Sequence, residues 1–513
     1  MLIDALTDPP QAGQVFQADV CIIGGGVAGL TLTKELAKNG LSVITLEGGG
    51  LKESKRSQAV YRGENSGRKY FRLHRARRRY LGGSSNCWAG LCARLRPTDF
   101  EKRSWIPHSG WPISSEDINP YYDEAGKILK IGPFHPLLDQ KREPGTHLSG
   151  PGLKLDGFES VFFQMSPPVR LGKLWRDDLK ALKQVKVFVN ANVSHLQLAE
   201  HGQAMQSVDC QVFDGPKFKV KAKFFILAGG GIENPRMLLN ARDVAKAGIG
   251  NQHDFVGRYF MEHPHIDRES LWLPAGMASR LNYYRSRKRK ATKDRVWPCL
   301  RLSAERLAEE ELLDFSLVLF KRSNIAKEEK NHPLLTAVQR SSEYLHNPVR
   351  KPKPILAYTF GNPMEQAPNP DSRVMLDEDG ARDELGLIKS TLNWQLTSLE
   401  KRTLRRGHEL FAEAVVIGNH GRMRVTPTLN LDTFPKQTKG GYHHMGTTRM
   451  ADHEREGVVD RDCKVFGVDN LYVAGSSVFT TSGAANPTLS IVALALRLAE
   501  HLSQRTQRED KTP

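Results

Sequence analysis

The chain has 513 residues, which predicts two or three domains, and its 39% of hydrophobic residues makes packed cores feasible, so disorder is not expected. Its 74 Lys and Arg residues outnumber its 57 Asp and Glu residues, so the net charge is +17 and an anionic partner stays open. The six cysteines show no repeated CxxC spacing, which argues against a structural zinc site or a disulfide framework and is typical of a reducing compartment.

The N-terminal segment, MLIDALTDPPQAGQVFQ, lacks a basic start followed by an apolar stretch, so a secretory signal is not expected. No run of about 18 apolar residues occurs later in the chain, so no membrane-spanning helix is expected. We therefore expect a cytoplasmic protein.

The first clear unit is a strand, a helix and a second strand between residues 18 and 47. Residues 18–23 form a short apolar run that is typical of a buried parallel strand, and residues 41–46 form another. The apolar spacing between them predicts a helix that ends at Asn39–Gly40. This order is the strand–helix–strand unit of a nucleotide-binding fold.

The turn after the first strand carries the spacing GxGxxG, formed by Gly24, Gly26 and Gly29. The first glycine permits a tight turn, the second lets a pyrophosphate approach the backbone, and the third lets helix and strand pack closely. Glu47 ends the second strand, where a carboxylate can accept hydrogen bonds from ribose hydroxyls and would repel a ribose phosphate. The pattern therefore predicts a dinucleotide other than NADP, and by itself it does not choose between FAD and NAD.

Two later segments repeat the pattern of an apolar strand that runs into a glycine turn, at 223–231 and 470–475. A long stretch between them holds alternating, strand-like pieces at 314–323 and 355–362 and an amphipathic helix at 398–416. We therefore predict an α/β fold class, with a discontinuous Rossmann-type domain and an inserted α+β substrate domain built on an antiparallel sheet. The predicted nucleotide-binding domain comprises 15–110, 180–265 and 435–503, and the predicted substrate domain comprises 111–179 and 266–434.

Much of the positive charge lies in two runs, Arg68 to Tyr80 and Arg280 to Arg295. One interpretation is an electrostatic patch for nucleic acid, an anionic surface or an acidic partner. The plainer interpretation is a solvated loop face, which we favour because neither run carries a recognisable nucleic-acid module. No nucleic-acid partner is expected.

Three further segments accompany the glycine turn: YLGGSSNCWAG (80–90), FILAGGGIENPRMLL (225–239) and GYHHMGTTRM…NLYVAGSSVFTTSGAANPTLSIVALALR (441–497). Together they resemble the glucose–methanol–choline (GMC) oxidoreductase family, flavoproteins that oxidise alcohols and sugars. The order and spacing of the four blocks are similar from about residue 18 to residue 503. The HxMGTTRM form with the closing ANPTL looks most like the pyranose oxidase-like sugar oxidoreductases. The resemblance implies that the Rossmann-type domain binds FAD.

The resemblance also implies the catalytic residues. The family's catalytic base is the first histidine of the C-terminal block, which falls on His443, and its partner in the ANP segment falls on Asn486. A neutral imidazole suits a base because its unperturbed pKa is about 6.5. His444 is expected to be structural, since neighbouring extended side chains face opposite ways. His263 and His265 resemble histidines that the family often has beneath the flavin, and their role stays open.

Cys87 stands where some family members carry the histidine that tethers FAD, so a non-covalent FAD is expected. The GGSS-type turn is expected against the flavin and pyrophosphate, Val193 at the adenine, Gly475 near the ribityl chain, and the N-terminus of the last helix near the flavin ring. The full set of expected cofactor contacts is Gly24, Gly26, Val27, Ala28, Gly29, Glu47, Gly82, Gly83, Ser84, Cys87, Val193, Ala228, Gly475, Pro487 and Thr488, and no metal site is expected.

The predicted activity is oxidation of a CH–OH group of a sugar, glycoside or cyclitol by hydride transfer to FAD with a histidine base. Oxidation of an aliphatic or aromatic alcohol is an alternative, and so is a lyase that holds FAD without a redox step. The expected partner is a small alcohol or sugar. Oxygen, a quinone and a redox protein all stay open as electron acceptor.

Overall fold

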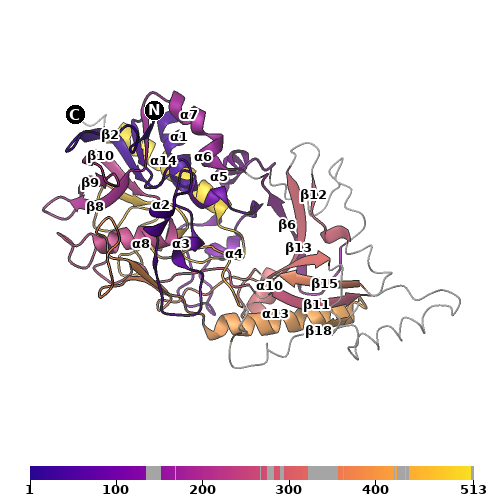
Figure 1. The fold of residues 1–513 in the computed structure, drawn as a ribbon. Helices are drawn as coiled ribbons and strands as arrows, with labels where there is room; N and C mark the ends of the chain where they lie inside the picture. The colour runs from indigo at the N-terminus through magenta and orange to yellow at the C-terminus, as the bar shows by residue number, and fades with distance from the viewer. Residues whose placement is uncertain are drawn as a thin grey trace, which may run out of the picture.

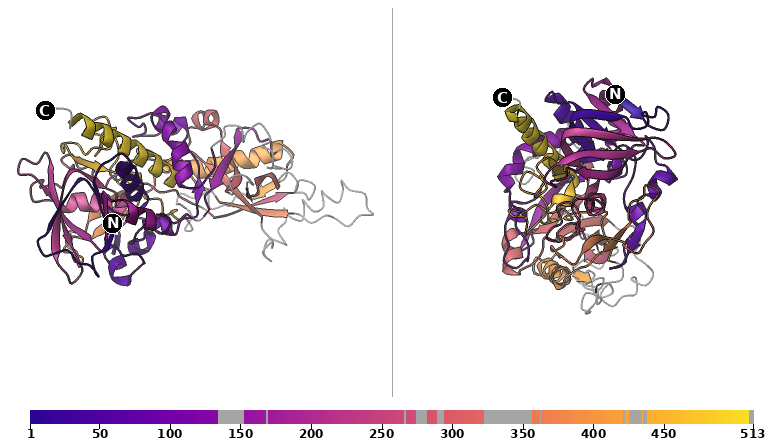
Figure 2. Two further views of the ribbon diagram at one scale, coloured as in Figure 1. Left: turned by 90° about the horizontal axis from the view of Figure 1, so that it is seen from above. Right: turned by 90° about the vertical axis from the view of Figure 1, so that its left-hand side faces the viewer.

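The structure is a computed structural model, and it describes residues 1–133, 152–167, 169–265, 267–273, 282–288, 294–321, 356–361, 363–420, 422–424, 434 and 438–509. Two eight-stranded sheets lie at opposite ends of an elongated molecule, as Figures 1 and 2 show. The first sheet is built mainly from the N-terminal half and from the C-terminal strand. The second sheet is built mainly from the middle of the chain.

The first sheet is largely parallel. Its order is β1 (Leu2–Asp4), β7 (Val185–Val189), β3 (Val43–Leu46), β2 (Val15–Ile23), β10 (Lys217–Leu227), β9 (Met205–Gln211) and β8 (Asn192–Leu198), and β19 (Leu471–Val473) also pairs with β10. Only the pairs β10–β9 and β9–β8 are antiparallel. Segments far apart in the chain thus form one sheet, which confirms the predicted discontinuous Rossmann-type fold.

Helices cover the first sheet because its strands are apolar on both faces. β3 is buried at every position, and so are Val20 to Ile23 at the end of β2. Helix α1 (Val27–Lys38) packs on β2 and β3, and α14 (Thr488–Glu509) packs on α1 and on α5 (Ser115–Ile128). Helix α8 (Gly230–Asn240) follows β10 and contacts β8. None of the described helices is long and apolar enough to cross a membrane.

The second sheet is antiparallel. Its order is β18 (Arg422–Arg424), β11 (Asp267–Leu273), β15 (Leu356–Gly361), β14 (Ser316–Lys321), β13 (Arg295–Leu302), β6 (Phe158–Met165) and β5 (Leu91–Cys92), and β12 (Arg287–Lys288) pairs with β13. Helix α13 (Ser398–Ile417) lies along this sheet in Figure 1 and buries Leu404, Phe411 and Val415 in a core shared with β13 and β14. The antiparallel sheet confirms the fold class predicted for the second region, whereas its domain boundaries stay a proposal.

Smaller elements complete the fold. A three-stranded sheet joins β16 (Arg373–Leu376) and β17 (Ser390–Asn393) to β4 (Gly63–Asn65). The remaining elements are short: α2 (Lys55–Ala59), α3 (Leu73–Ala76), η1 (Gly83–Asn86), α4 (Pro97–Phe100), α6 (Leu171–Leu174), α7 (Arg176–Ala181), η4 (Asn282–Tyr284), α10 (Ala304–Glu309) and η6 (Ser476–Val478).

Candidate active site

The glycine turn between β2 and α1 has the geometry that its sequence predicts. Gly24 has a φ of +115°, and a Cβ there would lie 2.6 Å from the Ala228 carbonyl oxygen. A Cβ at Gly29 would lie 1.9 Å from the Gly24 carbonyl oxygen, so only glycine lets α1 pack this closely on the turn. A Cβ at Gly26 would meet no atom closer than 4.0 Å, which leaves room beside the N-terminus of α1 for a phosphate group.

Glu47 lies at the carboxyl end of β3 and closes this turn. Its carboxylate accepts hydrogen bonds from the Gly25 N–H at 2.9 Å and from the Gly49 N–H at 2.7 Å. Burial raises the pKa of the Glu47 carboxyl, and the Arg79 cation and the two N–H donors oppose that shift. The carboxylate is therefore fixed in direction beside the glycine turn, where it can accept further hydrogen bonds from a ligand.

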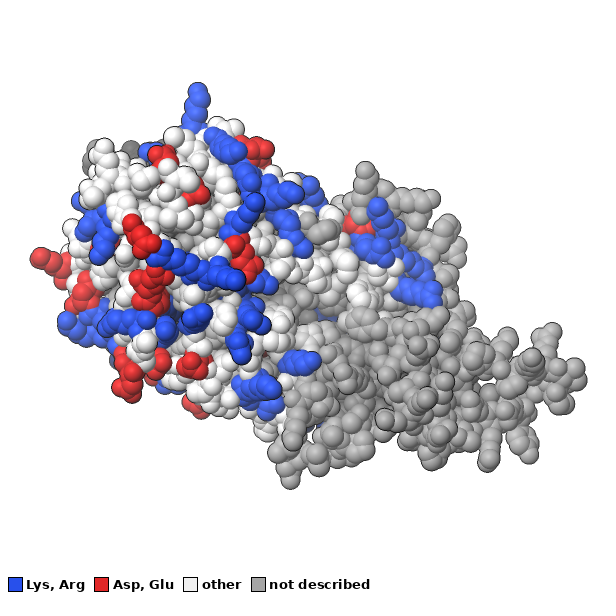
Figure 3. Space-filling view, in the orientation of Figure 1, with Lys and Arg blue, Asp and Glu red and all other residues white. Residues whose placement is uncertain are grey.

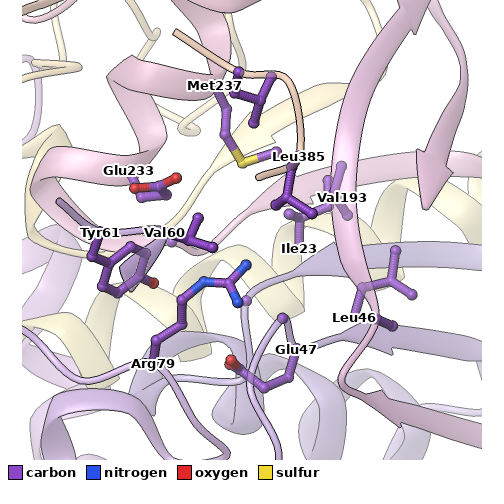
Figure 4. Close-up of a pocket in the computed structure, with 15 residues that line it drawn as sticks. Ile23, Leu46, Glu47, Val60, Tyr61, Arg79, Val193, Glu233, Met237 and Leu385 are labelled. Atoms are coloured by element: carbon purple, nitrogen blue, oxygen red, sulfur yellow. The ribbon is translucent and has the colours of Figure 1, made fainter. Parts of the chain in front are cut away.

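A cavity opens next to Glu47. Charged and apolar side chains both line it, and Figure 4 shows Arg79 extending into it between Glu47 and Tyr61, with the apolar Val193 and Leu385 on the other side. A carboxylate for ribose, an apolar wall for adenine and a glycine turn for pyrophosphate thus lie together. These residues fit the adenosine diphosphate part of FAD.

The basic run from Arg68 to Tyr80 is only partly a surface feature. Arg77 and Arg79 are buried, so the prediction of a solvated loop face is wrong for these two. The Arg77 guanidinium pairs with Glu233 at 3.1 Å and lies over the Tyr61 ring at 4.1 Å, which offsets part of the cost of its burial. Elsewhere on the face in Figure 3, Lys and Arg are interspersed with Asp and Glu. Part of the second basic run, at 280–281 and 289–293, lies outside the described residues.

The second glycine turn packs against the first. The Gly82 N–H donates to the Gly25 carbonyl at 2.8 Å, and a Cβ at Gly83 would lie 3.1 Å from the Gly26 Cα. Ser84 follows in η1, and Cys87, whose side chain is exposed, ends that turn with its Sγ 3.4 Å from the Ser84 carbonyl.

The remaining predicted cofactor contacts lie near the carboxyl ends of the parallel strands of the first sheet. Val27 and Ala28 start α1, Ala228 follows β10, and Gly475 follows β19. A Cβ at Gly475 would meet no atom within 4 Å. Pro487 and Thr488 start α14, and the Ile491 N–H bonds to the Pro487 carbonyl at 2.8 Å.

His443 and Asn486 meet beside these strand ends. The Asn486 Nδ2 lies 3.2 Å from the His443 Nε2, although the two residues are far apart in the chain. On its other side, the His443 Nδ1 lies 2.9 Å from the His263 Nδ1. The Ser476 hydroxyl donates to the His444 carbonyl at 2.7 Å, which ties the histidine segment to the turn after β19. The Asn486 amide, the His443 imidazole and the His263 imidazole thus follow one another, and we call these three side chains the histidine row.

Glu262 holds this row in place. One carboxylate oxygen accepts from the backbone N–H groups of Gly441 at 2.8 Å, His443 at 3.0 Å and His263 at 3.1 Å. The other oxygen accepts from the Tyr70 hydroxyl. Glu262 is completely buried, and burial raises the pKa of its carboxyl while these donors oppose the shift.

His444 faces away from the His443–Asn486 pair. Its Nε2 lies 3.0 Å from the Tyr70 hydroxyl, and its side chain is buried. Burial, with the Arg77 cation, lowers the pKa of His444 to about 3. Burial and the neighbouring histidines hold the pKa of His443 well below its usual value, and burial lowers the pKa of His263 to about 4. All three imidazoles are therefore neutral at pH 7.

Two residues that support the histidine row, Glu262 and Tyr70, were not identified from the sequence. Tyr70 lies inside the basic run, and Glu262 precedes His263 by one position, so neither carries a local signal of its own. In the nucleotide cavity, Arg79, Tyr61 and Glu233 were missed for the same reason. Among the described residues, no group of three His, Cys, Asp or Glu side chains is arranged to hold a metal ion.

Comparisons with known proteins find two family matches and several full-length relatives. Residues 19–245 match the family described as FAD dependent oxidoreductase, and residues 368–495 match the family described as GMC oxidoreductase. The chain is 24% identical to 2-methyl-1,2-propanediol dehydrogenase of Mycolicibacterium austroafricanum, over 95% of this chain and 96% of that protein. It is 22% identical to the fructose dehydrogenase large subunit of Gluconobacter japonicus, over 95% and 98%.

Among solved structures, a formate oxidase is similar to this chain with a TM-score of 0.61 and 16% identity, over 97% of this chain and 100% of that one. At this identity the likeness shows the fold alone. It extends over both sheets, so the whole architecture is shared.

Proposed function

Because this chain belongs to the GMC oxidoreductase family and is an FAD-dependent enzyme, we propose that it oxidises a CH–OH group of a sugar, glycoside or cyclitol, with His443 as the general base. The observation that carries the proposal is the pairing of His443 with Asn486 beside the glycine turns. The sugar preference draws on the pyranose oxidase-like form of the C-terminal block and on the similarity to a fructose dehydrogenase subunit.

FAD, when bound, supplies the acceptor for the hydride that leaves the substrate carbon. The residues proposed to hold its adenosine diphosphate part are the Gly24–Gly29 turn, Glu47 and Val193. Gly83 and Gly475 are proposed to contact the rest of the cofactor. The placement is supported by the room at two glycines: a Cβ at Gly26 would meet only the Ala228 carbonyl oxygen, at 4.0 Å, and a Cβ at Gly475 would meet no atom within 4 Å.

The proton of the substrate hydroxyl is proposed to pass to the Nε2 of His443. A neutral imidazole with an unprotonated Nε2 can accept it, and the lowered pKa keeps His443 neutral over the physiological range. The Asn486 amide is proposed to donate a hydrogen bond to the same hydroxyl oxygen, which aligns the carbon's hydrogen for transfer. The first N–H groups of α14 follow Asn486 directly, so the positive end of that helix favours negative charge developing there.

A non-sugar alcohol is the nearest alternative substrate, and the similarity to 2-methyl-1,2-propanediol dehydrogenase keeps it open. A lyase that holds FAD without a redox step is the alternative of another class. An anaerobic screen of sugars and simple alcohols separates the three. Bleaching of the yellow flavin by sugars before simple alcohols is the expected result. Bleaching by simple alcohols alone would overturn the sugar preference, and cleavage of a substrate without bleaching would overturn the oxidoreductase.

A further inference from the structure

The two imidazoles of the histidine row share one proton in a hydrogen bond between their Nδ1 atoms. The Nδ1 atoms of His263 and His443 are 2.9 Å apart, and their rings are nearly perpendicular at 76°. A hydrogen bond between two imidazole nitrogens needs one protonated and one unprotonated nitrogen. The groups bonded to the other nitrogen of each ring determine which Nδ1 is protonated and donates.

The contact of the His263 Nε2 determines which ring donates in the hydrogen bond between the two Nδ1 atoms. Its Nε2 lies 3.4 Å from the Ser482 carbonyl oxygen, which can only accept a hydrogen bond, so the Nε2 carries the proton. Burial keeps His263 neutral by lowering its pKa to about 4, and a neutral imidazole has one N–H. Its Nδ1 is therefore unprotonated and accepts from the Nδ1–H of His443.

The far side of His443 gives the same direction independently. Its Nε2 faces the Asn486 Nδ2, an amide nitrogen that donates. The bonds thus run one way, from Asn486 through His443 and His263 to the Ser482 carbonyl.

The backbone under both rings is fixed by one atom. The same oxygen of Glu262 accepts from the backbone N–H groups of His263 and His443, so the two chain segments keep a constant separation. Glu262 has no access to solvent, and its other oxygen is occupied by the Tyr70 hydroxyl. The ring-to-ring bond is therefore a built feature of the fold.

We infer that His263 is a positioning residue that holds His443 in the tautomer whose Nε2 is unprotonated. This inference rests on the proposed function of His443. When the substrate O–H bond breaks, the proton forms a new bond to the His443 Nε2, and the hydride leaves carbon with its electron pair for FAD. The His443 ring then carries a positive charge, and its Nδ1–H makes a stronger, charge-assisted hydrogen bond to His263. Both the resting tautomer and the charged state depend on the acceptor at the His263 Nδ1.

The ¹⁵N resonances of the histidine rings in the wild-type holoenzyme test the tautomer directly. His443→Ala identifies which signals belong to His443 by their disappearance. The expected spectrum at pH 7 has a protonated Nδ1 and an unprotonated Nε2 for His443. A protonated Nε2 in the resting enzyme would overturn the inference without any variant of His263.

Two variants of His263 test the effect on rate. His263→Leu removes the acceptor, and flavin reduction is expected to slow by about 10–100-fold, the range seen when a partner that orients a histidine is lost. His263→Asn places an amide oxygen as many bonds from the backbone as the Nδ1, so it should recover most of the rate and the wild-type ¹⁵N pattern. FAD retention should be the same in both.

The outcomes separate this inference from the proposed function. If His443→Ala reduces flavin at the wild-type rate, the proposed base is wrong whatever His263 does. If His443→Ala is slow while His263→Leu and His263→Asn have equal rates and unchanged His443 tautomers, the proposed base stands and the positioning role of His263 is wrong.

Discussion

Two buried glutamates organise the two halves of the site, and they differ in what lies around them. Glu47 accepts two backbone N–H groups, has Arg79 beside it and borders a cavity. Glu262 accepts three backbone N–H groups and a hydroxyl and is closed off from solvent. A carboxylate on a cavity can bind a ligand, whereas an enclosed one can only hold the protein around it. We therefore expect changes at Glu47 to affect binding and changes at Glu262 to affect the fold of the site.

The largest effect on stability should come from Glu262→Ala. The change leaves four donors, each at least partly buried, without an acceptor, and an unsatisfied buried donor costs about 1–3 kcal/mol. Glu47→Ala is the matched control, because it strands two N–H groups beside a cavity that water can enter. Urea unfolding of the two variants should show a much larger loss for Glu262→Ala. Equal losses in the free energy of unfolding would mean that the two carboxylates stabilise the fold to the same extent.

The next effect is on FAD binding. Glu47→Gln should weaken FAD by roughly tenfold or more, since a hydrogen bond to a charged group contributes about 1.5–3 kcal/mol. The FAD retained after extensive dialysis measures this. Glu53→Gln, at an exposed position where the carboxylate pairs with Arg78, should retain FAD like the wild type. Equal retention in both variants would remove Glu47 from the binding site.

A smaller effect is the pH dependence of the free energy of unfolding, to which buried histidines inside and outside the histidine row both contribute. Burial lowers the pKa of both His263 and His408 to about 4, against about 6.5 in the unfolded chain. Between these values the unfolded state binds the proton and the folded state does not, so stability falls as pH drops from 6.5 toward 4. Each such histidine contributes up to about 1.4 kcal/mol per pH unit.

His408 lies in α13, where its ring packs against Phe315 in the core of the second sheet, so His408→Gln should flatten the stability–pH curve without changing flavin reduction. Unfolding measured at pH 7, 6 and 5 tests this. An unchanged slope in the variant would show that His408 titrates normally in the folded protein.

The smallest effect concerns Cys87. Acid precipitation of the wild type should release a yellow supernatant, because Cys87 stands where a tethering histidine would be and its thiol is a plain exposed group. Cys87→Ser should retain FAD at neutral pH and release it in acid just as the wild type does. Flavin that stays with the wild-type precipitate and is released from Cys87→Ser would identify a thioether instead.

The nucleotide half could be predicted from the sequence, because its signals are local. Gly24, Gly26, Gly29 and Glu47 lie in one strand–helix–strand unit, where spacing alone fixes their relative positions. The discontinuous first sheet and the antiparallel second sheet were predicted from the apolar runs and the alternating segments, whereas the order of the strands came from the structure. The domain boundaries stay a proposal, because the strands of the second sheet come from several separate stretches.

The histidine half could be predicted only in part. His443 and Asn486 came from a resemblance, and their contact depends on the turn after β19 and the start of α14. Glu262 and Tyr70 were missed because their hydrogen bond spans more than 170 positions, so no local pattern marks them. His263 was singled out by the resemblance, but its contact with His443 also spans more than 170 positions and could not be predicted. Arg79 was missed because a buried arginine and a solvated one look the same in a basic run.

Flavin reduction in single-turnover mixing with a substrate, compared between His443→Ala and His444→Ala, tests the central claim most directly. The two residues are adjacent, so general damage to the segment would affect both. His443→Ala should slow flavin reduction by at least about 100-fold, the lower end of what a general base contributes, while FAD stays bound. His444→Ala should have a much smaller effect, since its ring faces Tyr70. Normal flavin reduction in His443→Ala, or a larger loss in His444→Ala, would contradict the account.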